Sequence, residues 1–427
     1  MPENKIKCEL MIIGSGIAGM AASLFAAENG IKAVQVGMAG ELTFASGLID
    51  LMGVYPFTDG TVRDNPFEAL ADVARDIPAH PLAKITPEDI NISIDKVLTF
   101  LTAGGLTYHR DKEKNHLMIT GIGTVKPSHC IPSAMMAGVK AYRDKTPCLV
   151  IDIHGMKGFS ARQISETLKA EWPEISYETV VFPDTHGEVF GENIAFSIEN
   201  PEILKKFAEN IIPCIKHNKV VGLPAILGIG KSETVRGNLE KMLGVPVFEI
   251  PGLPPSVPGI RIKSVFESEL PKRGIALLSQ KKVIDVQIKD GGGFLFTIGN
   301  GDGSQSELIE ADAAVLATGR FLGKGLAADY STIREVLFDL PVHQPENRRQ
   351  WHSRDFFDRN GHQVNAAGVE TDDLFRPIDS DGNPVVKNLY AAGSVLAHND
   401  WKRMKSGAGV SIASAYAAVK SYLAFKG

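Results

Sequence analysis

The chain begins with an uncharged apolar stretch that is broken by glycines. Eighteen residues without a charged side chain run from Leu10 to Ala27, which is long enough to suggest a membrane-spanning helix. Residues 14–16, Gly-Ser-Gly, interrupt the stretch after a few positions, and the preceding residues MPENKIKCE carry both signs of charge rather than a basic leader. We therefore interpret the stretch as a strand at 10–13, a glycine turn and a helix.

The spacing of apolar residues after the turn supports this interpretation. They recur every three or four positions, as on one face of a helix; they are Ile17, Met20, Ala21, Leu24 and Phe25. Gly30 ends the helix, and a second strand at 31–36 follows at once. Strand, G-x-G-x-x-G, helix and strand within about thirty residues form the context of a dinucleotide-binding turn.

The glycine turn predicts a phosphate site. Gly14 makes the tight turn, Gly16 lets the backbone approach a pyrophosphate, and Gly19 lets the helix pack closely on the sheet. Free N–H groups at the positive helix end then hold the phosphate, whereas a merely structural turn is the alternative. The cofactor contacts expected here are Gly14, Ser15, Gly16, Ile17, Ala18, Gly19, Val36 and Gly37.

One residue typical of a dinucleotide site is missing. An acidic residue about twenty positions after the glycines normally binds the ribose hydroxyls. Here the second strand ends in VQVGMAG, residues 34–40, and the nearest acid is Glu41. This argues against NAD and against the adenosine half of FAD.

Later alternation predicts a β-meander between residues 281 and 319. Apolar residues alternate with polar ones at 284–288 and again at 294–298, and a third strand leads into ADAAVLATG. Such a meander is common in flavoproteins with two dinucleotide-binding domains, and its last strand would lie beside the first strand of the chain. That placement would bring Ala317, Thr318 and Gly319 near the nucleotide; an ordinary hairpin with a buried continuation is the alternative.

The C-terminal region predicts a second contact with a flat ligand. A strand at 389–392 precedes a turn and a polar loop, and Ser406 can cap a helix that starts with small residues. Bare N–H groups there would let an isoalloxazine ring approach, and the positive helix end would stabilise reduced flavin. A small-residue helix packed on the sheet is the alternative. The expected contacts are Gly393, Ser394, Gly407, Ala408, Gly409 and Val410.

The middle of the chain has a different character. It contains amphipathic helix candidates and the stretch VPVFEIPGLPPSVPGIRI at 245–262, where five prolines argue against a helix and suggest a cap or a docking surface. The predicted fold class is α/β, a Rossmann-like FAD/NAD(P)-binding flavoprotein fold with a β-meander and an inserted cap domain. Residues 1–55, 145–181 and 275–427 are assigned to the flavin-binding domain, and residues 56–144 and 182–274 to the cap.

Composition narrows the class of protein further. The 427 residues are enough for two or three domains, and a net charge of −5 argues against nucleic-acid binding through bulk charge. The four cysteines are scattered without a C-x-x-C pair, so an iron–sulfur cluster is not expected, and neither are disulfides. No metal-ligand cluster stands out. We expect a reduced cytoplasmic protein without its own membrane span.

Several stretches together resemble the B subunit of anaerobic glycerol-3-phosphate dehydrogenase. They are IIGSGIAGM, LTFASGLIDLMG, LVIDIHGMKGFSA, VFEIPGLPPSVPGIRI, and the long C-terminal stretch from AAGVETDDLF to SGAGVSIASAYAA. The resemblance runs in order over most of the chain. It adds Ser46 and Gly47 to the expected cofactor contacts.

The resemblance implies a cofactor, partners and a reaction. Family members are described as FMN flavoproteins that work with a catalytic FAD subunit and an iron–sulfur membrane anchor. Such complexes oxidise glycerol 3-phosphate to dihydroxyacetone phosphate and pass electrons to the quinone pool. FMN has no adenosine ribose, which suits the missing acid, although FAD held by backbone groups near residues 36–37 stays open. The expected location is the inner face of the cell membrane, reached through a partner subunit.

Candidates for catalysis lie mainly in the loop before the C-terminal helix. His398 is the first candidate for handling a proton, because its free pKa lies near neutrality. Lys402, Arg403 and Lys405 could bind an anionic substrate, and Arg261 and Arg320 are further candidates of this kind. For each of these residues a purely structural role is the alternative.

Two other functions compete with the leading one. The first is a self-contained FAD-dependent dehydrogenase or reductase of the fumarate-reductase type, which a basic pocket under the cap would favour. The second is a non-catalytic scaffold subunit, which a colourless purified protein would support.

Overall fold

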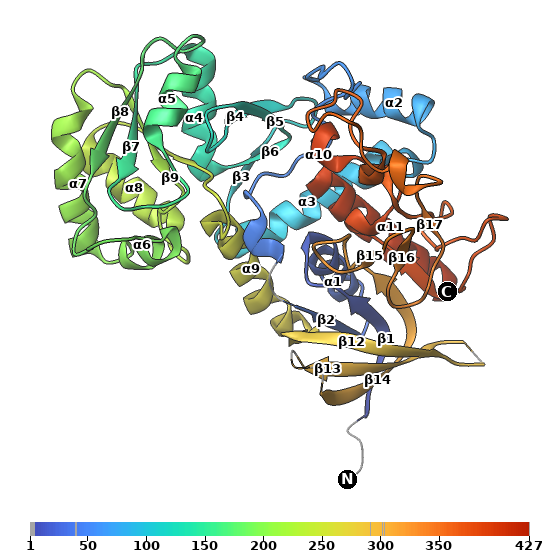
Figure 1. Ribbon diagram of the computed structural model, residues 1–427. Helices are drawn as coiled ribbons and strands as arrows, with labels where there is room; N and C mark the ends of the chain where they lie inside the picture. Colours follow the sequence, from blue (N-terminus) through green and yellow to red (C-terminus); the bar gives the residue numbers. More distant parts are fainter. Residues whose placement is uncertain (1–4, 39–40, 291, 301, 303, 427) are drawn as a thin grey trace. The chain divides into compact units, whose positions relative to one another are not determined.

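The computed structural model describes the chain except for residues 1–4, 39–40, 291, 301, 303 and 427 (Figure 1). The chain divides into two compact units. The first comprises residues 1–41, 50–97 and 266–427, and the second comprises residues 42–49 and 98–265. Among the helices that the structure describes, none combines the length and apolarity needed to cross a membrane.

The first unit is built on a seven-stranded sheet. Its strands lie in the order β11-β2-β1-β14-β13-β12, and β19 pairs with the end of β14 beyond β13. The strands are β1 Lys5–Ile13, β2 Ala33–Gly37, β11 Ala276–Ser279, β12 Lys281–Ile288, β13 Phe294–Asn300, β14 Gln305–Leu316 and β19 Leu389–Ala391. The pairs β11–β2, β2–β1, β1–β14 and β14–β19 are parallel, so these strands end at the same edge of the sheet.

Helices pack on this sheet because its central strands are apolar on both faces. β1 is buried at Leu10–Ile13, and α1 (Ile17–Glu28) is buried along most of its length. α11 (Gly407–Lys426) packs against α1, where the rings of Phe25 and Tyr416 meet edge to face at 5.2 Å. The remaining elements of this unit are α2 Pro66–Asp76, α10 Trp401–Met404, β15 Leu326–Ala328, β16 Ile333–Glu335, β17 Val342–His343, β18 Gly368–Val369, and the 3-10 helices η2 Pro81–Lys84, η3 Pro271–Arg273, η4 Arg348–Gln350, η5 Gln363–Ala366 and η6 Gly393–Val395.

The predicted β-meander is present, with one difference in detail. β12, β13 and β14 pair in antiparallel order, and β14 lies beside β1 as predicted. The register of β12 shifts between Val283 and Asp285, and the side chains of Ile284 and Ile288 are 39% and 53% exposed. The alternation at 284–288 therefore does not give a continuous buried face: Ile284 lies at the irregularity, and Ile288 is exposed at the end of this edge strand.

The second unit contains its own parallel sheet of four strands, in the order β10-β9-β7-β8. They are β7 Cys148–Ile153, β8 Ile175–Val180, β9 Val220–Pro224 and β10 Val247–Ile250. The helices around them are α4 Ser133–Asp144, α5 Ala161–Leu168, α6 Gly191–Ser197, α7 Pro201–Ile215 and α8 Ser232–Leu243. Two small antiparallel sheets complete the unit: β3 Tyr108–Arg110 with β6 Cys130–Pro132, and β4 His116–Ile119 with β5 Val125–Ser128. The helices α3 Pro87–Ala103 and α9 Val257–Glu269 contribute residues to both units.

Two sequence-based assignments in this unit need correction. The sequence pattern assigns residues 145–181 to the flavin-binding domain, but β7 and β8 pair with each other and β7 with β9, in a sheet separate from the first. The proline-rich stretch at 245–262 is not one stiff loop: it holds the buried strand β10 and the start of α9. Pro258 lies in the first turn of α9, where its missing N–H breaks no helix hydrogen bond.

Candidate functional site

The ends of three parallel strands meet at one edge of the first sheet. The Ala317 N–H donates to the Ile13 carbonyl at 2.8 Å, and the Ala392 N–H donates to the Leu316 carbonyl at 2.9 Å. Gly14 follows directly with φ +128°, and a Cβ on it would lie 2.1 Å from the Ala317 carbonyl oxygen. Only glycine fits there. The structure thus brings the glycine turn, Ala317 and Thr318 together, as the sequence predicted.

A buried glutamine supports the turn, and sequence reasoning missed it. The Gln35 amide donates from Nε2 to the Gly14 carbonyl at 2.8 Å and accepts from the Ser23 hydroxyl at 2.9 Å. A Cβ on Gly19 would lie 2.0 Å from the Gly14 carbonyl oxygen, so α1 crosses the turn closely. A single polar residue in the apolar strand sequence AVQVG was the available signal.

The N-terminal end of α1 is open to an anion. Gly16 is the N-cap in extended conformation, no side chain caps the helix, and its first turn carries no acidic residue. Among the described residues, none accepts a hydrogen bond from the N–H of Ile17 or Ala18. The positive end of the helix dipole is therefore available to a phosphate.

The end of β2 lies against the same turn. The Gly14 N–H donates to the Val36 carbonyl at 2.8 Å, and the Ser15 hydroxyl donates to the Met38 carbonyl at 2.8 Å. A Cβ on Gly37 would lie 2.6 Å from the Ser15 nitrogen, so glycine is required for this approach. The side chain of Glu41, the nearest acid, lies outside the described part of the chain.

The start of α11 differs from its prediction. The Ser406 hydroxyl is buried and has no hydrogen-bond partner among the described residues, so the expected side-chain cap is not formed. The Gly409 N–H donates to the Asp50 carbonyl at 2.7 Å, and a Cβ on Gly409 would lie 2.8 Å from the Leu51 Cα. Part of the helix start that was expected to face a ligand therefore packs against residues 50–51.

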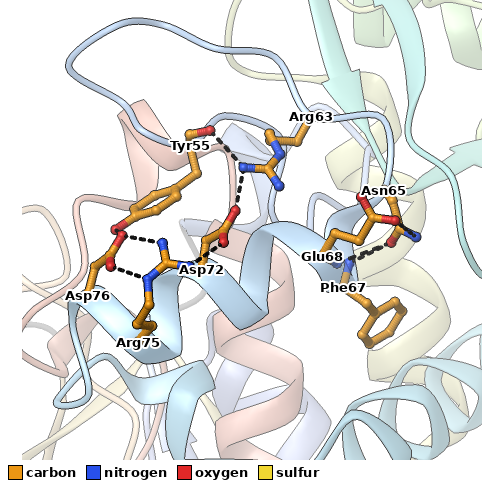
Figure 2. A network of polar contacts seen from close by, with 8 residues as sticks. All are labelled: Tyr55, Arg63, Asn65, Phe67, Glu68, Asp72, Arg75 and Asp76. Carbon is orange, nitrogen blue, oxygen red and sulfur yellow. Dashed lines mark hydrogen bonds and ion pairs between the residues drawn. The ribbon is translucent and has the colours of Figure 1, made fainter.

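A polar network ties the chain that follows residues 50–51 to α2 (Figure 2). Arg63 bridges the Tyr55 carbonyl at 3.3 Å and the Asp72 carboxylate at 2.8 Å. The Tyr55 hydroxyl donates to Asp76 at 2.9 Å, and the Asn65 side chain caps the start of α2. This network holds the segment whose first residues cover Gly409.

Gly393 lies between the two helices that flank the strand ends. It has φ +83°, its N–H donates to the Ser414 hydroxyl at 2.9 Å, and a Cβ on it would lie 2.6 Å from the Ala18 Cβ. Ser394 follows on η6, and Ala408 and Val410 are buried in α11. Gly319 has φ +72°, and Gly407 lies next to the Trp401 ring.

Ser46 and Gly47 belong to the second compact unit. Gly47 has φ +84°, a Cβ on it would lie 2.8 Å from the Pro258 Cβ, and its carbonyl accepts a hydrogen bond from the Tyr108 hydroxyl at 2.9 Å. Within that unit, the positive φ and the packing against Pro258 together explain the glycine.

A pocket of about 160 Å³ with both polar and apolar lining lies in the first unit beside the loop that carries His398. It is lined by Ala79, Pro81, Lys84, Val369, Glu370, Thr371, Ile378, Leu396, Ala397 and His398. The His398 Nε2 lies 2.5 Å from the Glu370 carboxylate, and the His343 ring lies against His398 with ring centres 4.1 Å apart. Burial and then the neighbouring His398 lower the pKa of His343.

Lys84 is the cation of this pocket, and sequence reasoning missed it. Its Nζ donates to the Thr371 carbonyl at 2.5 Å, and burial lowers the pKa of its ammonium group. His80, four residues earlier, is fully buried, and burial lowers its pKa to about 3. The His80 Nδ1 accepts from the Leu82 N–H, so Nε2 carries the proton, and Nε2 has no partner among the described residues.

Arg320 clamps the loop before α10. Its guanidinium donates to three backbone carbonyls, those of Asn365, Leu396 and Asn399. Burial lowers its pKa to about 10. Most of the N–H donors of Arg320 are therefore used in hydrogen bonds to the backbone of this chain.

The two basic candidates in α10 differ in their contacts. Arg403 donates to the carbonyls of Asp358 and Arg359 and so fixes that loop. Lys402 is exposed and lies over the Trp401 ring at 5.5 Å. Lys402 is therefore the more accessible of the two.

Arg261 is buried in the second unit. It forms a bidentate ion pair with Glu249 at 2.6 and 2.7 Å, and its Nε donates to the Gly228 carbonyl at 2.7 Å. Both side chains are almost fully buried, with exposed fractions of 5% and 0%. These contacts use all three nitrogens of the guanidinium.

Comparisons with known proteins fit this arrangement. The FAD binding domain family matches residues 9–412. The B subunit of anaerobic glycerol-3-phosphate dehydrogenase from Vibrio vulnificus (strain YJ016) is 30% identical over 98% of this chain and 97% of its own length. The probable B subunit of the same enzyme from Halobacterium salinarum (strain ATCC 29341 / DSM 671 / R1) is 31% identical over 97% of both chains.

Solved structures give a weaker likeness. The 3-ketosteroid delta1-dehydrogenase of Sterolibacterium denitrificans is 12% identical over 98% of this chain and 100% of that chain, with a TM-score of 0.44. This score is too low to bear on function. The family match confirms the predicted flavoprotein fold class. The chain therefore belongs to the FAD binding domain family of flavoproteins, together with the proteins named as the B subunit of anaerobic glycerol-3-phosphate dehydrogenase.

Proposed function

We propose that this chain is a flavin-binding subunit of a glycerol-3-phosphate dehydrogenase that delivers electrons to quinone. The observation that carries the proposal is the identity of about 30% along nearly the whole chain with two relatives of that name. The open glycine turn supports it, because its geometry suits a phosphate group.

The residues around the turn fit the phosphate of a flavin nucleotide. The N–H groups at the start of α1 would hold it, and the close approach at Gly14 and Gly19 keeps the turn rigid. When bound, the flavin supplies hydride and electron transfer. The chain contributes position and charge: backbone donors bind the phosphate, and Gln35 fixes the carbonyl of Gly14 so that these donors stay in place.

FMN remains the proposed cofactor. No acid follows β2 before Glu41 to bind an adenosine ribose, which is the argument for FMN. The family match favours FAD. Mass spectrometry of the chromophore released by heat distinguishes them: FMN alone supports the proposal, and FAD alone overturns it.

His398 is the proposed proton-handling residue. Its Nε2 contacts the Glu370 carboxylate, which would orient the ring. Lys84, in the same pocket, and the exposed Lys402 are the proposed contacts for an anionic substrate. In this proposal Arg261, Arg320 and Arg403 position the protein backbone rather than bind substrate.

The proposed partners are a catalytic FAD subunit and an iron–sulfur membrane anchor. The word subunit in the relatives' names supports a complex. Among the described residues, none of the four cysteines belongs to a group of three or more potential metal ligands. Electrons would therefore need a partner to reach a lipid-soluble quinone. The proposed location is the cytoplasmic face of the membrane.

The decisive experiment compares the isolated chain with the assembled complex. Flavin content is measured first, followed by quinone reduction that depends on glycerol 3-phosphate, with and without the partner subunits. We expect a yellow chain that reduces quinone only in the complex. A colourless chain would support the scaffold role. Efficient quinone reduction by the isolated chain would support a self-contained dehydrogenase.

A further inference from the structure

Two histidines and a glutamate from three separate segments converge in the first unit. His343 ends β17, Glu370 follows β18, and His398 follows η6. The Glu370 Oε1 lies 2.5 Å from the His398 Nε2 and 3.8 Å from the His343 Nδ1. One ligand atom from each residue lies within 4.8 Å of the others.

The backbone holds these three residues in place. β17 and β18 pair, with His343 opposite Gly368, and the Ala397 N–H donates to the Val369 carbonyl at 3.0 Å. The His398 N–H donates to the Ala366 carbonyl at 2.9 Å. Each side chain therefore leaves a hydrogen-bonded segment, and its position does not depend on a flexible loop alone.

Other contacts reinforce the position of His398. It adopts φ +60°, a left-handed conformation that is uncommon for a residue with a Cβ. Arg320 holds the carbonyls of Leu396 and Asn399 on either side of it, each at 2.9 Å. The strained conformation is thus maintained by the surrounding structure, as is typical of functional positions.

The donor set is that of a transition-metal site. Two imidazole nitrogens and one carboxylate oxygen are common ligands of Zn²⁺, with bonds of about 2.0–2.2 Å and a fourth position left open. The observed separations of 2.5 and 3.8 Å lie on either side of the distance of about 3.3 Å between ligands of a tetrahedral site with such bonds. Small side-chain rotations would bring the three atoms to equal distance from one ion.

We propose that His343, Glu370 and His398 bind a divalent transition-metal ion, with Zn²⁺ as the ion that fits best. Glu370 and His398 also line the pocket of about 160 Å³, so the open coordination position would lie beside that pocket. An ion on the His398 Nε2 would displace its hydrogen bond to Glu370 and block proton transfer there. Zinc would then inhibit any reaction that uses His398 as an acid or base.

The test uses the full-length, flavin-loaded chain after removal of metal with a chelator. Zn²⁺ is titrated by calorimetry, and bound metal is counted by elemental analysis after gel filtration. The variants are Glu370→Gln, His398→Asn and His343→Asn. His352→Asn is the matched control, because His352 and His362 form another close histidine pair, with ring centres 5.4 Å apart, outside the proposed site.

We expect one Zn²⁺ per chain for the wild type and for His352→Asn. Each ligand variant should bind at least about 100-fold more weakly. Circular dichroism checks that the variants are folded, and Glu370→Gln keeps the side-chain volume if a histidine variant fails to fold. Wild-type protein without saturable binding, or binding that survives both Glu370→Gln and His398→Asn, would overturn the proposal. Because binding is measured without turnover, this result is independent of the proposed enzymatic function.

Discussion

Two of the glycine turns that join a parallel strand to a helix differ in what lies against their N–H groups. In the first unit, residues 14–16 join β1 to α1, and the N–H groups of Ile17 and Ala18 have no described acceptor. In the second unit, residues 225–231 join β9 to α8 and contain Gly228 and Gly230. There the N–H groups of Ile229, Gly230 and Lys231 all donate to Glu199 Oε1, at 2.7, 2.8 and 3.2 Å.

This difference shows what a glycine turn predicts and what it does not. In the second unit these three successive N–H groups make an anion-binding nest. In the first unit the N–H groups at the start of α1 offer a comparable site. In the second unit the protein supplies the anion itself, and the pKa of Glu199 is lowered because these hydrogen bonds outweigh the effect of burial. A turn of this kind therefore predicts a bound negative charge, but not whether it comes from a cofactor or from the chain.

A neutral side chain, Gln35, holds the first turn, whereas a buried ion pair between Arg261 and Glu249 holds the second. Removing the ion pair should have the largest effect on stability. The Leu227 N–H donates to Glu249, which is paired with Arg261 at an exposed fraction of 0%. Arg261→Met leaves this buried carboxylate without its partner, so we expect a loss of about 3–5 kcal/mol in unfolding free energy. Flavin content should stay unchanged in the folded fraction. Denaturant unfolding measures the stability change.

Arg236→Met is the control for this prediction. Arg236 pairs with Glu233 and Glu240 on α8, but its side chain is 22% exposed. Partly exposed pairs contribute at most about 1 kcal/mol. Equal losses for the two arginine variants would contradict the view that the second turn depends on a buried ion pair.

A side chain at the centre of the first turn should prevent flavin binding there. Gly16→Val fills the space that a phosphate needs, so we expect flavin binding to weaken by about 100-fold or more, which is about 2.7 kcal/mol. Thermal unfolding of the flavin-free protein should change little, because Gly16 has an extended backbone that any residue can adopt. Flavin-to-protein ratios from absorbance measure the effect.

Gly230→Val is the matched change in the second turn. The nearest atom to a Cβ on Gly230 is Glu199 Oε1, at 3.9 Å, so there is room for a side chain. It should leave the flavin content intact. A full complement of flavin in Gly16→Val would mean that the first turn, like the second, is structural.

The local parts of this comparison were predictable from sequence, and the non-local parts were not. Strand, turn and helix at 10–28 follow from apolar spacing and glycine placement. Nothing local in the segment 148–153 indicates that it pairs in a separate sheet, because pairing depends on distant strands. The contact between residues 50–51 and Gly409 is likewise between segments far apart in the sequence.

The candidate residues show the same limit. The sequence placed His398 in a polar loop, but it could not place Glu370 and His343 beside it. Their contact depends on the pairing of β17 with β18 and on the bridge between Val369 and Leu396. Likewise, the sequence does not show that the guanidinium of Arg261 forms an ion pair. Its buried partner Glu249 lies on another element.

Loss of Gln35, the neutral residue that holds the first turn, should reduce stability less than loss of the ion pair beside the second turn. Gln35→Met keeps the side-chain length but removes the donor to the Gly14 carbonyl. Loss of a buried partner of this kind costs about 1–3 kcal/mol. We expect that loss in unfolding free energy together with weaker flavin binding, measured by denaturant and by flavin titration. Unchanged affinity would show that Gln35 stabilises the fold without positioning the turn.

Removal of the Glu199 carboxylate should make the second turn, like the first, available to an external anion. Glu199→Ala leaves three N–H groups without their acceptor, and water can replace part of the contact because Glu199 is only half-buried. We expect a loss of about 1–2 kcal/mol. Inorganic phosphate should then stabilise Glu199→Ala in thermal unfolding more than it stabilises the wild type. The absence of any difference would mean that the nest has no affinity for anions beyond the tethered carboxylate.

The smallest expected effect is a pH dependence of the same contact. The pKa of Glu199 in the folded protein lies below its ordinary value of 4.5, so the unfolded chain takes up its proton first as the pH falls. The stabilisation from Glu199 is therefore fully present above pH 4.5 and is lost as the pH falls through the lower, folded pKa. Glu199→Gln keeps the shape and removes the titration. Its stability deficit at pH 7, which we expect to be about 1 kcal/mol, should shrink as the pH is lowered below 4.5, and unfolding midpoints of both proteins across this range measure it. A deficit that stays constant with pH would show that the nest binds the side chain through its shape and not through its charge.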